Sequence, residues 1–457
     1  MITPSDRLRQ EPRRVAVRPV PHDAQTPAES PSSAEEDAYH RLKATLHQRV
    51  VGRLDLSQLG QLSAEVLRQE VGAVLADVAQ SGDLPLNRRE REKLVQELLD
   101  EILGLGPLEE LLRDAAVSDI LVNGFSTIFV ERRGRLATTA LRFRDNEHLM
   151  HTINRIVSRV GRRVDESTPM VDARLPDGSR VNAIIPPLAV DGPMLSIRRF
   201  GRTPIRMEDM IRLGSLTEAM ALFLEACVKG RLNILISGGT GTGKTTMLNA
   251  MSSFIPAAER VVTIEDAAEL QLQKPHVVRL ETRPPNLEGK GEVVTRDLVR
   301  NSLRMRPDRI IVGEIRSAEV LDMLQAMNTG QGSMATVHAN SPRDAINRMM
   351  TMIGMSGMAM SEPMMAGTIS RALHLVLQLH RGCDGTRRLV GVSEITGTEG
   401  QVVQMQDIFV FEQRGIGADG QLVGEFLATG LRPRCTEQLE RAGCSLEPAL
   451  FSTARRR

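Results

Sequence analysis

The spacing of apolar residues changes along the chain, and each spacing predicts a different kind of structure. From about Tyr39 to Leu112, apolar side chains recur every three or four positions, which is the period of a helix that buries one face. This pattern includes Leu62, Val66, Leu67, Val71, Val74, Leu75, Val78, Leu94, Leu98 and Ile102. Asn87 precedes the last helical run and is expected to be its N-cap. We therefore expect a small helical bundle over residues 39–106.

After Gly106-Pro107 the apolar pattern becomes that of short strands. The β-rich runs are Asp119–Val122, Thr127–Glu131, Leu136–Leu141, Val181–Ile185 and Met194–Arg198. One amphipathic helix interrupts them, with Leu149, Ile153, Ile156, Val157 and Val160 on its inner face. We expect a compact α+β domain over residues 107–200. A linker over residues 201–214 should follow, beginning with Gly201-Arg202-Thr203-Pro204.

From residue 215 onward, strand-like and helix-like runs alternate, which is typical of a parallel sheet covered on both faces. Ser215-Leu216-Thr217-Glu218 has the pattern of a capping box and should open a helix to about Val228. Strands are expected at Leu232–Ser237, Val261–Ile264, Val277–Leu280, Arg309–Val312 and Ala335–Val337, then near 374–380, 387–396, 403–413 and 421–428, before a helix around 435–442. The pattern predicts an α/β domain over 215–457 with a β-rich C-terminal extension.

The composition is that of a globular protein without a global preference for nucleic acid. The formal net charge is +1, and aromatic residues make up only 2% of the chain, which disfavours stacking of single-stranded bases. The four cysteines, Cys227, Cys383, Cys435 and Cys444, form no CxxC pair, so we expect reduced thiols and no zinc site.

The two features that would direct a chain to a membrane or out of the cell are missing from the sequence pattern. No run approaches the ~20 apolar residues that span a bilayer, and the N-terminus lacks the apolar region of a secretory signal. Residues 1–38 are rich in Pro, Ser, Ala and charge and are expected to be disordered, either as a tether for a partner or as an idle tail. We expect a cytoplasmic protein.

One segment matches the phosphate-binding pattern G-x-x-x-x-G-K-[ST] in full. It reads Gly238-Gly239-Thr240-Gly241-Thr242-Gly243-Lys244-Thr245, and Thr246 follows it. The segment lies between an expected apolar strand and an expected helix, which is the context that supports such a match. Its glycines allow backbone N–H groups to face the phosphates at a helix N-terminus. We expect this P-loop to bind ATP, with Lys244 on the β- and γ-phosphates and Thr245 on Mg²⁺.

Acidic residues end two of the strands expected after the P-loop. Glu314 follows the run Arg309–Gly313 and suits a role in holding Mg²⁺ through water, while Glu265-Asp266 follows Val261–Ile264. We assign Glu265 to positioning the attacking water and Glu314 to the metal, and the sequence leaves the reverse division open. Glu314 could instead be a solvated carboxylate at a strand end, and Asp266 could be a helix N-cap.

His338 ends a further strand of small residues, where a group that senses the γ-phosphate would fit. A lone histidine is more often structural than catalytic, so this role is a hypothesis. The methionine-rich segment 349–365 is interpreted as helix core, with a subunit seam or partner groove as the alternative.

The order of these segments resembles the secretion ATPase superfamily, whose Walker A, Asp box, Walker B and His box they match. The match includes Leu303-Arg304-Met305-Arg306-Pro307-Asp308 and Gly313-Glu314-Ile315-Arg316, and it covers about residues 100–430. Within that superfamily the chain is most similar to the Tad (Flp) pilus assembly ATPases, the CpaF or TadA group. The similar stretches are Gly104–Glu109, Ser118–Gly124, Arg162–Glu166, Pro169–Leu175, Asp177–Ala183, Ser196–Phe200 and Glu281–Asn286. The tetracysteine zinc insert of many related ATPases is missing, which favours the Tad branch.

The resemblance implies a RecA-like P-loop NTPase domain preceded by a smaller α+β domain and an N-terminal helical bundle. It further implies a homohexamer with ATP and Mg²⁺ beneath the α+β domain, where Arg180, Arg198 and Arg199 would reach over the nucleotide. These arginines could instead be surface residues of an edge strand. The implied partners are inner-membrane platform proteins, which would hold the chain at the membrane without a segment of its own.

Three functions follow as hypotheses. The first is a cytoplasmic motor that couples ATP hydrolysis to pilus assembly or to export through an inner-membrane platform. The second is a nucleic-acid translocase, against which the low aromatic content and small net charge count. The third is a nucleotide-dependent assembly scaffold without hydrolysis, which the presence of Lys244, Glu265 and Glu314 disfavours. The sequence does not identify the cargo.

Overall fold

The computed structural model describes residues 43, 45–47, 49–50, 52, 69, 71–73, 87–132, 134–199, 204–285, 289–417 and 420–453. The predicted disordered tail and most of the first helical runs lie outside the described residues. The chain divides into two compact units, residues 1–110 and 111–457. Within the part that the structure describes, no helix is long and apolar enough to cross a membrane.

In the first unit, helix α3 (Arg88–Leu103) begins at the predicted N-cap. The Asn87 side chain accepts from the Glu90 backbone N–H at 3.0 Å, and the Glu90 carboxylate accepts from the Asn87 N–H at 2.8 Å. This capping box satisfies two N–H groups that a helix start leaves without intrahelical partners. The apolar face of α3 is buried at Leu94, Leu98 and Leu99. The helical period and its cap at Asn87 are therefore confirmed for this stretch.

The N-terminal part of the second unit is a six-stranded sheet with the order β3-β2-β1-β6-β5-β4. All its neighbours are antiparallel. Its elements are α4 (Leu108–Arg113), which begins before the unit boundary, β1 (Val117–Asn123), β2 (Thr127–Arg132), β3 (Arg135–Thr138), α5 (Asn146–Arg159), β4 (Met170–Arg174), β5 (Arg180–Ile184) and β6 (Met194–Arg198). Five of the strands and α5 were predicted. The sequence pattern missed β4, in which only Val171 is buried, so it lacks a clear apolar alternation.

The rest of the second unit is built on a nine-stranded sheet, β15-β14-β13-β12-β7-β11-β10-β8-β9. The run from β12 to β9 is parallel, and β13, β14 and β15 extend it as antiparallel neighbours. The strands are β7 (Ile234–Gly238), β8 (Val261–Glu265), β9 (Val277–Glu281), β10 (Arg309–Ile315), β11 (Gly332–Val337), β12 (Leu375–Arg381), β13 (Arg387–Glu399), β14 (Val402–Ile416) and β15 (Leu422–Ala428). The predicted α/β fold with a β-rich extension is confirmed.

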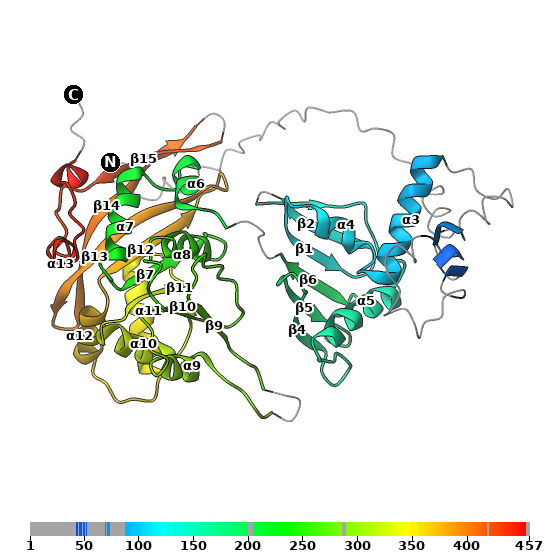
Figure 1. Cartoon of the computed structure of the whole chain (residues 1–457), viewed down its shortest axis with the longest axis horizontal. Coiled ribbons are helices and arrows are strands. Elements are labelled where there is room, and N and C mark those ends of the chain that lie inside the picture. The colour runs from blue at the N-terminus through cyan, green and yellow to red at the C-terminus, as the bar shows by residue number, and fades with distance from the viewer. Residues whose placement is uncertain are drawn as a thin grey trace, which may run out of the picture. The chain divides into compact units, whose positions relative to one another are not determined.

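Helices cover both faces of this sheet, and each face has its own apolar core (Figure 1). One core includes residues of α6 (Met207–Arg212), α7 (Glu218–Lys229), α8 (Lys244–Ser252) and α13 (Thr436–Arg441). The other includes residues of α9 (Thr295–Ser302), α10 (Glu319–Asn328), α11 (Pro342–Gly354) and α12 (Glu362–Ala372). The central strands are buried on both sides, which explains their almost unbroken apolar runs. This burial fixes the strand ends on which the site is built.

Three local predictions differ from the structure. Helix α6 lies inside the expected linker, because Met207 and Met210 are apolar enough to join the core. Helix α7 is capped by Thr217, whose side chain accepts from the Met220 N–H, and not by Ser215. The methionine-rich segment is core only in part, since Met349 and Met352 are buried while Met355, Met358 and Met364 are exposed.

Candidate nucleotide site

The P-loop follows β7, the strand at the centre of the nine-stranded sheet, and leads directly into α8. Gly243 caps α8 with a φ of 95°, a conformation that glycine adopts without strain. At Gly238 a Cβ atom would lie 2.5 Å from the Thr242 hydroxyl and 2.8 Å from the Leu379 carbonyl oxygen. The loop therefore needs glycine at both of its ends, once for its backbone angle and once for close packing.

The backbone donors of this loop are available to a ligand. Among the described residues, the N–H groups of residues 240–246 have no hydrogen-bond partner. Unpartnered N–H groups at a helix N-terminus form a site for an anion. The Lys244 ammonium donates to the carbonyls of Gly238 and Gly239, at 3.0 Å each, and so lies folded back over the loop. These residues fit the phosphates of a nucleotide.

Burial is the main cause that lowers the pKa of Lys244. The nearby positive charges of Arg316 and Arg348 lower this pKa further, while the carboxylate of Glu314 opposes them. A lysine that is partly desolvated and faces cations gains from the arrival of a phosphate. The loop thus combines unpaired N–H donors with a lysine whose charge lacks full compensation.

Glu265 ends β8 and is buried, with 4% of its surface exposed. Its Oε2 accepts from the backbone N–H groups of Glu269 and Leu270, at 2.8 and 2.9 Å. Its Oε1 is buried without a partner among the described residues. Burial raises the pKa of Glu265 to about 6, and the two backbone donors act against that rise. A carboxylate that is held at one oxygen and free at the other can accept a proton from water.

Glu314 lies near the end of β10, the strand beside β8, and is half-buried. Its Oε2 accepts from Nη2 of Arg316 at 2.8 Å, and Nη1 of the same arginine lies 3.0 Å from Oδ2 of Asp266. Asp266 also accepts from the Thr295 hydroxyl at 3.2 Å. No helix begins at Asp266, so the N-cap alternative is wrong. The structure brings Glu265, Asp266 and Glu314 together at the carboxyl ends of two adjacent parallel strands.

His338 follows β11, which lies between the P-loop strand β7 and the Glu314 strand β10. It is half-buried and makes no hydrogen bond or ion pair within the described residues. The Thr336 hydroxyl donates to the Gly313 carbonyl at 2.6 Å and ties β11 to the end of β10. His338 thus follows the strand between the P-loop strand and the Glu314 strand, and its role as a sensor of the γ-phosphate stays a prediction.

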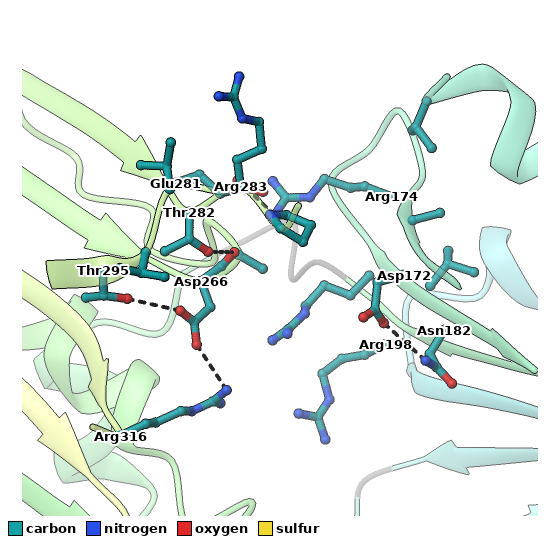
Figure 2. Close-up of a pocket in the computed structure, with 18 of the residues that line it drawn as sticks. Asp172, Arg174, Asn182, Arg198, Asp266, Glu281, Thr282, Arg283, Thr295 and Arg316 are labelled. Carbon is teal, nitrogen blue, oxygen red and sulfur yellow. Dashed lines mark hydrogen bonds and ion pairs between the residues drawn. The ribbon is translucent and has the colours of Figure 1, made fainter. Parts of the chain in front are cut away.

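Two of the three predicted arginines line a cleft between the β4–β6 strands and the acidic strand ends (Figure 2). Arg198 lies 3.2 Å from Asp119, and Arg180 forms an ion pair with Glu269 at 2.5 Å. Asp266 and Arg316 line the same cleft. P-loop residues do not, so the structure brings Arg180 and Arg198 to the acidic strand ends rather than to the glycine loop.

Arg199 points elsewhere. Its Nη1 donates to the backbone carbonyls of Leu111, Asp114 and Val117, and it does not line the cleft. These carbonyls extend from α4, through the turn at Asp114, to the first residue of β1. In this structure Arg199 therefore fastens that turn, and its predicted contact with a nucleotide would require it to leave three acceptors. A guanidinium has donors enough for several carbonyls at once, which a sequence pattern does not reveal.

Comparisons with known proteins show the family of this chain. Residues 101–422 match the family model described as type II/IV secretion system protein. The chain belongs to this family. A putative conjugal transfer protein of Mycobacterium tuberculosis is 36% identical, over 72% of this chain and 95% of that protein. The conjugal transfer protein TrbB of Rhizobium radiobacter is 33% identical, over 68% of this chain and 92% of that protein.

A solved structure also resembles this secretion-system protein. It is the VirB11 ATPase from the Brucella suis type IV secretion system, in complex with sulphate, at 28% identity and a TM-score of 0.34, over 63% of this chain and 91% of that one. Family membership and the complete P-loop make the present secretion-system protein a nucleotide-binding ATPase.

Sequence reasoning missed Arg316 and Thr295 as partners of the acidic strand ends. Glu314 lies in β10 and Arg316 directly follows that strand, and a spacing of two in extended chain places both side chains on the same face. That signal could have been used. Thr295 is 29 positions from Asp266, and no local pattern links them.

Proposed function

We propose that this secretion ATPase is a motor that converts ATP hydrolysis into movement for pilus assembly or protein export. One observation carries the proposal. The P-loop, whose N–H groups are unpartnered among the described residues, follows a strand of the same sheet that holds the acidic ends of β8 and β10. ATP hydrolysis needs two parts. One is a loop that binds the phosphates, and the other is a set of carboxylates that act on water. A scaffold that only binds nucleotide would need the loop alone.

The residues divide the work as follows in this proposal. The N–H groups of residues 240–246 and the Lys244 ammonium bind the phosphates and stabilise charge that develops on them. Glu265 accepts a proton from the attacking water through its free Oε1. Thr245 and Glu314 would hold Mg²⁺, which supplies charge neutralisation between the phosphates when bound. His338, Arg180 and Arg198 contact the nucleotide only after the parts around the cleft rearrange.

The finer assignment is to the Tad (Flp) pilus branch, as a cytoplasmic homohexamer that reaches the membrane through inner-membrane platform proteins. It is supported by the similar stretches from Gly104 to Asn286 and by the lack of a tetracysteine insert in the sequence. Movement would come from the α+β part, since Arg180 and Arg174 contact Glu269 and Glu281 beside the acidic strand ends. Contacts of this kind can differ between nucleotide states and so drive a change of conformation.

The test is phosphate release by the purified full chain. Lys244→Ala and Glu314→Gln are each expected to abolish it while the melting temperature stays near that of the wild type. Lys229→Ala is the matched control, since Lys229 is an exposed lysine on α7 that pairs only with Glu225 in the described structure. Hydrolysis by Lys244→Ala at the control rate would refute the site.

A second candidate is the motor of a conjugative type IV secretion machine, because the relatives described above are named conjugal transfer proteins. Deleting the gene separates the two. Loss of surface filaments with normal DNA transfer supports the Tad assignment, and loss of DNA transfer with intact filaments supports the conjugative one. Stimulation of ATPase activity by single-stranded DNA would instead indicate a nucleic-acid translocase.

A further inference from the structure

The hairpin formed by β12 and β13 ends beside the P-loop. Strand β12 runs parallel to β7, with Leu379 opposite Gly238, the first residue of the loop. The last residue of β12, Arg381, is paired in register with the first residue of β13, Arg387. Like charges that face each other directly across two strands destabilise the pair. Two arginines at this position therefore need acceptors nearby to offset their repulsion.

Those acceptors are backbone carbonyls, and one of them belongs to the P-loop. Arg387 donates from Nε to the carbonyl of Gly241 at 2.8 Å. A Cβ atom on Gly243 would lie 3.4 Å from Cδ of Arg387, so this side chain packs against the loop over two of its glycines. The hydrogen bond joins residues 146 positions apart. It fastens the loop through a carbonyl oxygen and uses none of the loop's N–H groups.

Arg381 lies beside the same loop, on the other strand. Its Nη1 would lie 3.5 Å from a Cβ atom on Gly241. Its Nη2 donates to the carbonyl of Gly134, in the turn between β2 and β3, at 2.8 Å. One guanidinium group therefore lies beside Gly241 of the glycine loop and donates to a turn of the six-stranded sheet.

The hairpin turn itself is firmly held. The Asp384 carboxylate accepts from the backbone N–H groups of Thr386 and Leu422, each at 3.0 Å, and pairs with Arg388 at 3.2 Å. The Arg388 guanidinium also lies over the Phe411 ring, 5.4 Å from its centroid. Because the turn is held by these contacts, the backbone positions of Arg381 and Arg387 at its two ends are fixed.

We propose that Arg387 and Arg381 are positioning residues of the nucleotide site, Arg387 by holding the P-loop and Arg381 by linking the P-loop to the β2–β3 turn. A donor on the Gly241 carbonyl polarises the peptide that this carbonyl shares with the Thr242 N–H. That N–H is one of the unpartnered donors offered to phosphate. Arg387 thus strengthens a phosphate contact without touching the nucleotide, and Arg381 passes a shift of the loop to the six-stranded sheet. The inference rests on the nucleotide site proposed above.

The first test uses full-length Arg387→Gln and Arg387→Lys, with ADP and ATP as probes. We expect Arg387→Gln to raise the dissociation constant of ADP and the KM for ATP about tenfold, with kcat and melting temperature unchanged. Arg387→Lys, which keeps a donor, should recover part of the affinity. A variant that merely misfolds would lose kcat and melting temperature instead. The matched control is Arg414→Gln, because Arg414 lies on β14 of the same sheet and pairs with Glu425.

The second test follows hydrogen exchange of residues 127–138 in full-length protein with and without ADP. We expect ADP to change exchange in the wild type and in Arg414→Gln, and to have no effect there in Arg381→Gln at saturating ADP. An ADP response that persists in Arg381→Gln would overturn the link. Wild-type affinity in Arg387→Gln would overturn the positioning role while leaving the nucleotide site intact. Failure of the wild type to bind ADP would overturn the site and the inference together.

Discussion

Nη2 of Arg316 and Oε2 of Glu314 lie 2.8 Å apart at the end of β10. The same guanidinium reaches Asp266 after β8, so one exposed arginine bridges the ends of two neighbouring strands. The pairing holds Glu314 in one orientation and lets Asp266 take a further hydrogen bond from Thr295. In the proposed division of roles Glu314 holds Mg²⁺, and a metal-binding carboxylate depends on the groups that orient it, so Arg316 would act on the site through its neighbours.

Replacing Arg316 with alanine should therefore slow hydrolysis more than it weakens nucleotide binding. We expect kcat to fall about 10- to 100-fold, the usual effect of losing a group that orients a metal-binding side chain. Arg316→Lys should not restore the rate, since an ammonium lacks the planar fork that spans two carboxylates. Steady-state phosphate release and ADP titration measure the two effects. An Arg316→Ala variant with wild-type kcat would contradict this role.

The burial of Glu265 makes the free energy of unfolding depend on pH, and the sign of this dependence follows from the raised pKa. Its pKa rises from an ordinary value of 4.5 to about 6, so the folded protein holds this proton more tightly than the unfolded chain does. The group therefore favours folding below about pH 4.5, and this contribution is lost as pH rises through about 6. At about pH 8, Glu265→Gln should be more stable than the wild type by up to about 2 kcal/mol.

The gain should disappear below about pH 3.5, because the wild-type carboxyl is then largely protonated in both states. Denaturant unfolding at both pH values measures it, and phosphate release should be lost in the same variant. Glu425→Gln is a suitable control, since Glu425 lies on β15 and pairs with Arg414. Equal stability of wild type and Glu265→Gln at both pH values would show that the carboxyl is not buried as described.

Arg198 and Arg199 are adjacent in sequence and should differ in their effects. Arg199→Ala leaves three backbone carbonyls without this donor and should lower the free energy of unfolding by about 1–3 kcal/mol. Arg198→Ala removes one exposed ion pair and should cost less than about 1 kcal/mol, yet slow hydrolysis if Arg198 reaches the nucleotide. Thermal melts and phosphate release on the two variants measure both effects. Reversed outcomes would assign the nucleotide role to Arg199.

The parts of the site that could be predicted are those encoded within a few consecutive residues. Gly238 to Thr245 specify a loop, a helix start and a lysine in a single stretch, and the apolar runs before Glu265 and Glu314 identify their strands. The linker prediction failed at Met207 because burial in a core depends on what packs against it. Polar composition around residues 201–206 suggested a connection, and the core of α7 and α8 decided otherwise.

The sequence by itself determined that this chain has a P-loop, two acidic strand ends and the segment order of a secretion ATPase. Only the tertiary structure decided which groups meet. Arg387 and Gly241 are 146 positions apart, and Arg381 and Gly134 are 247 apart, so no local spacing relates them. The physical reason is that a parallel sheet orders its strands by burial of their side chains, not by their place in the chain. That order brings β12 beside β7 and places the hairpin arginines on the glycine loop.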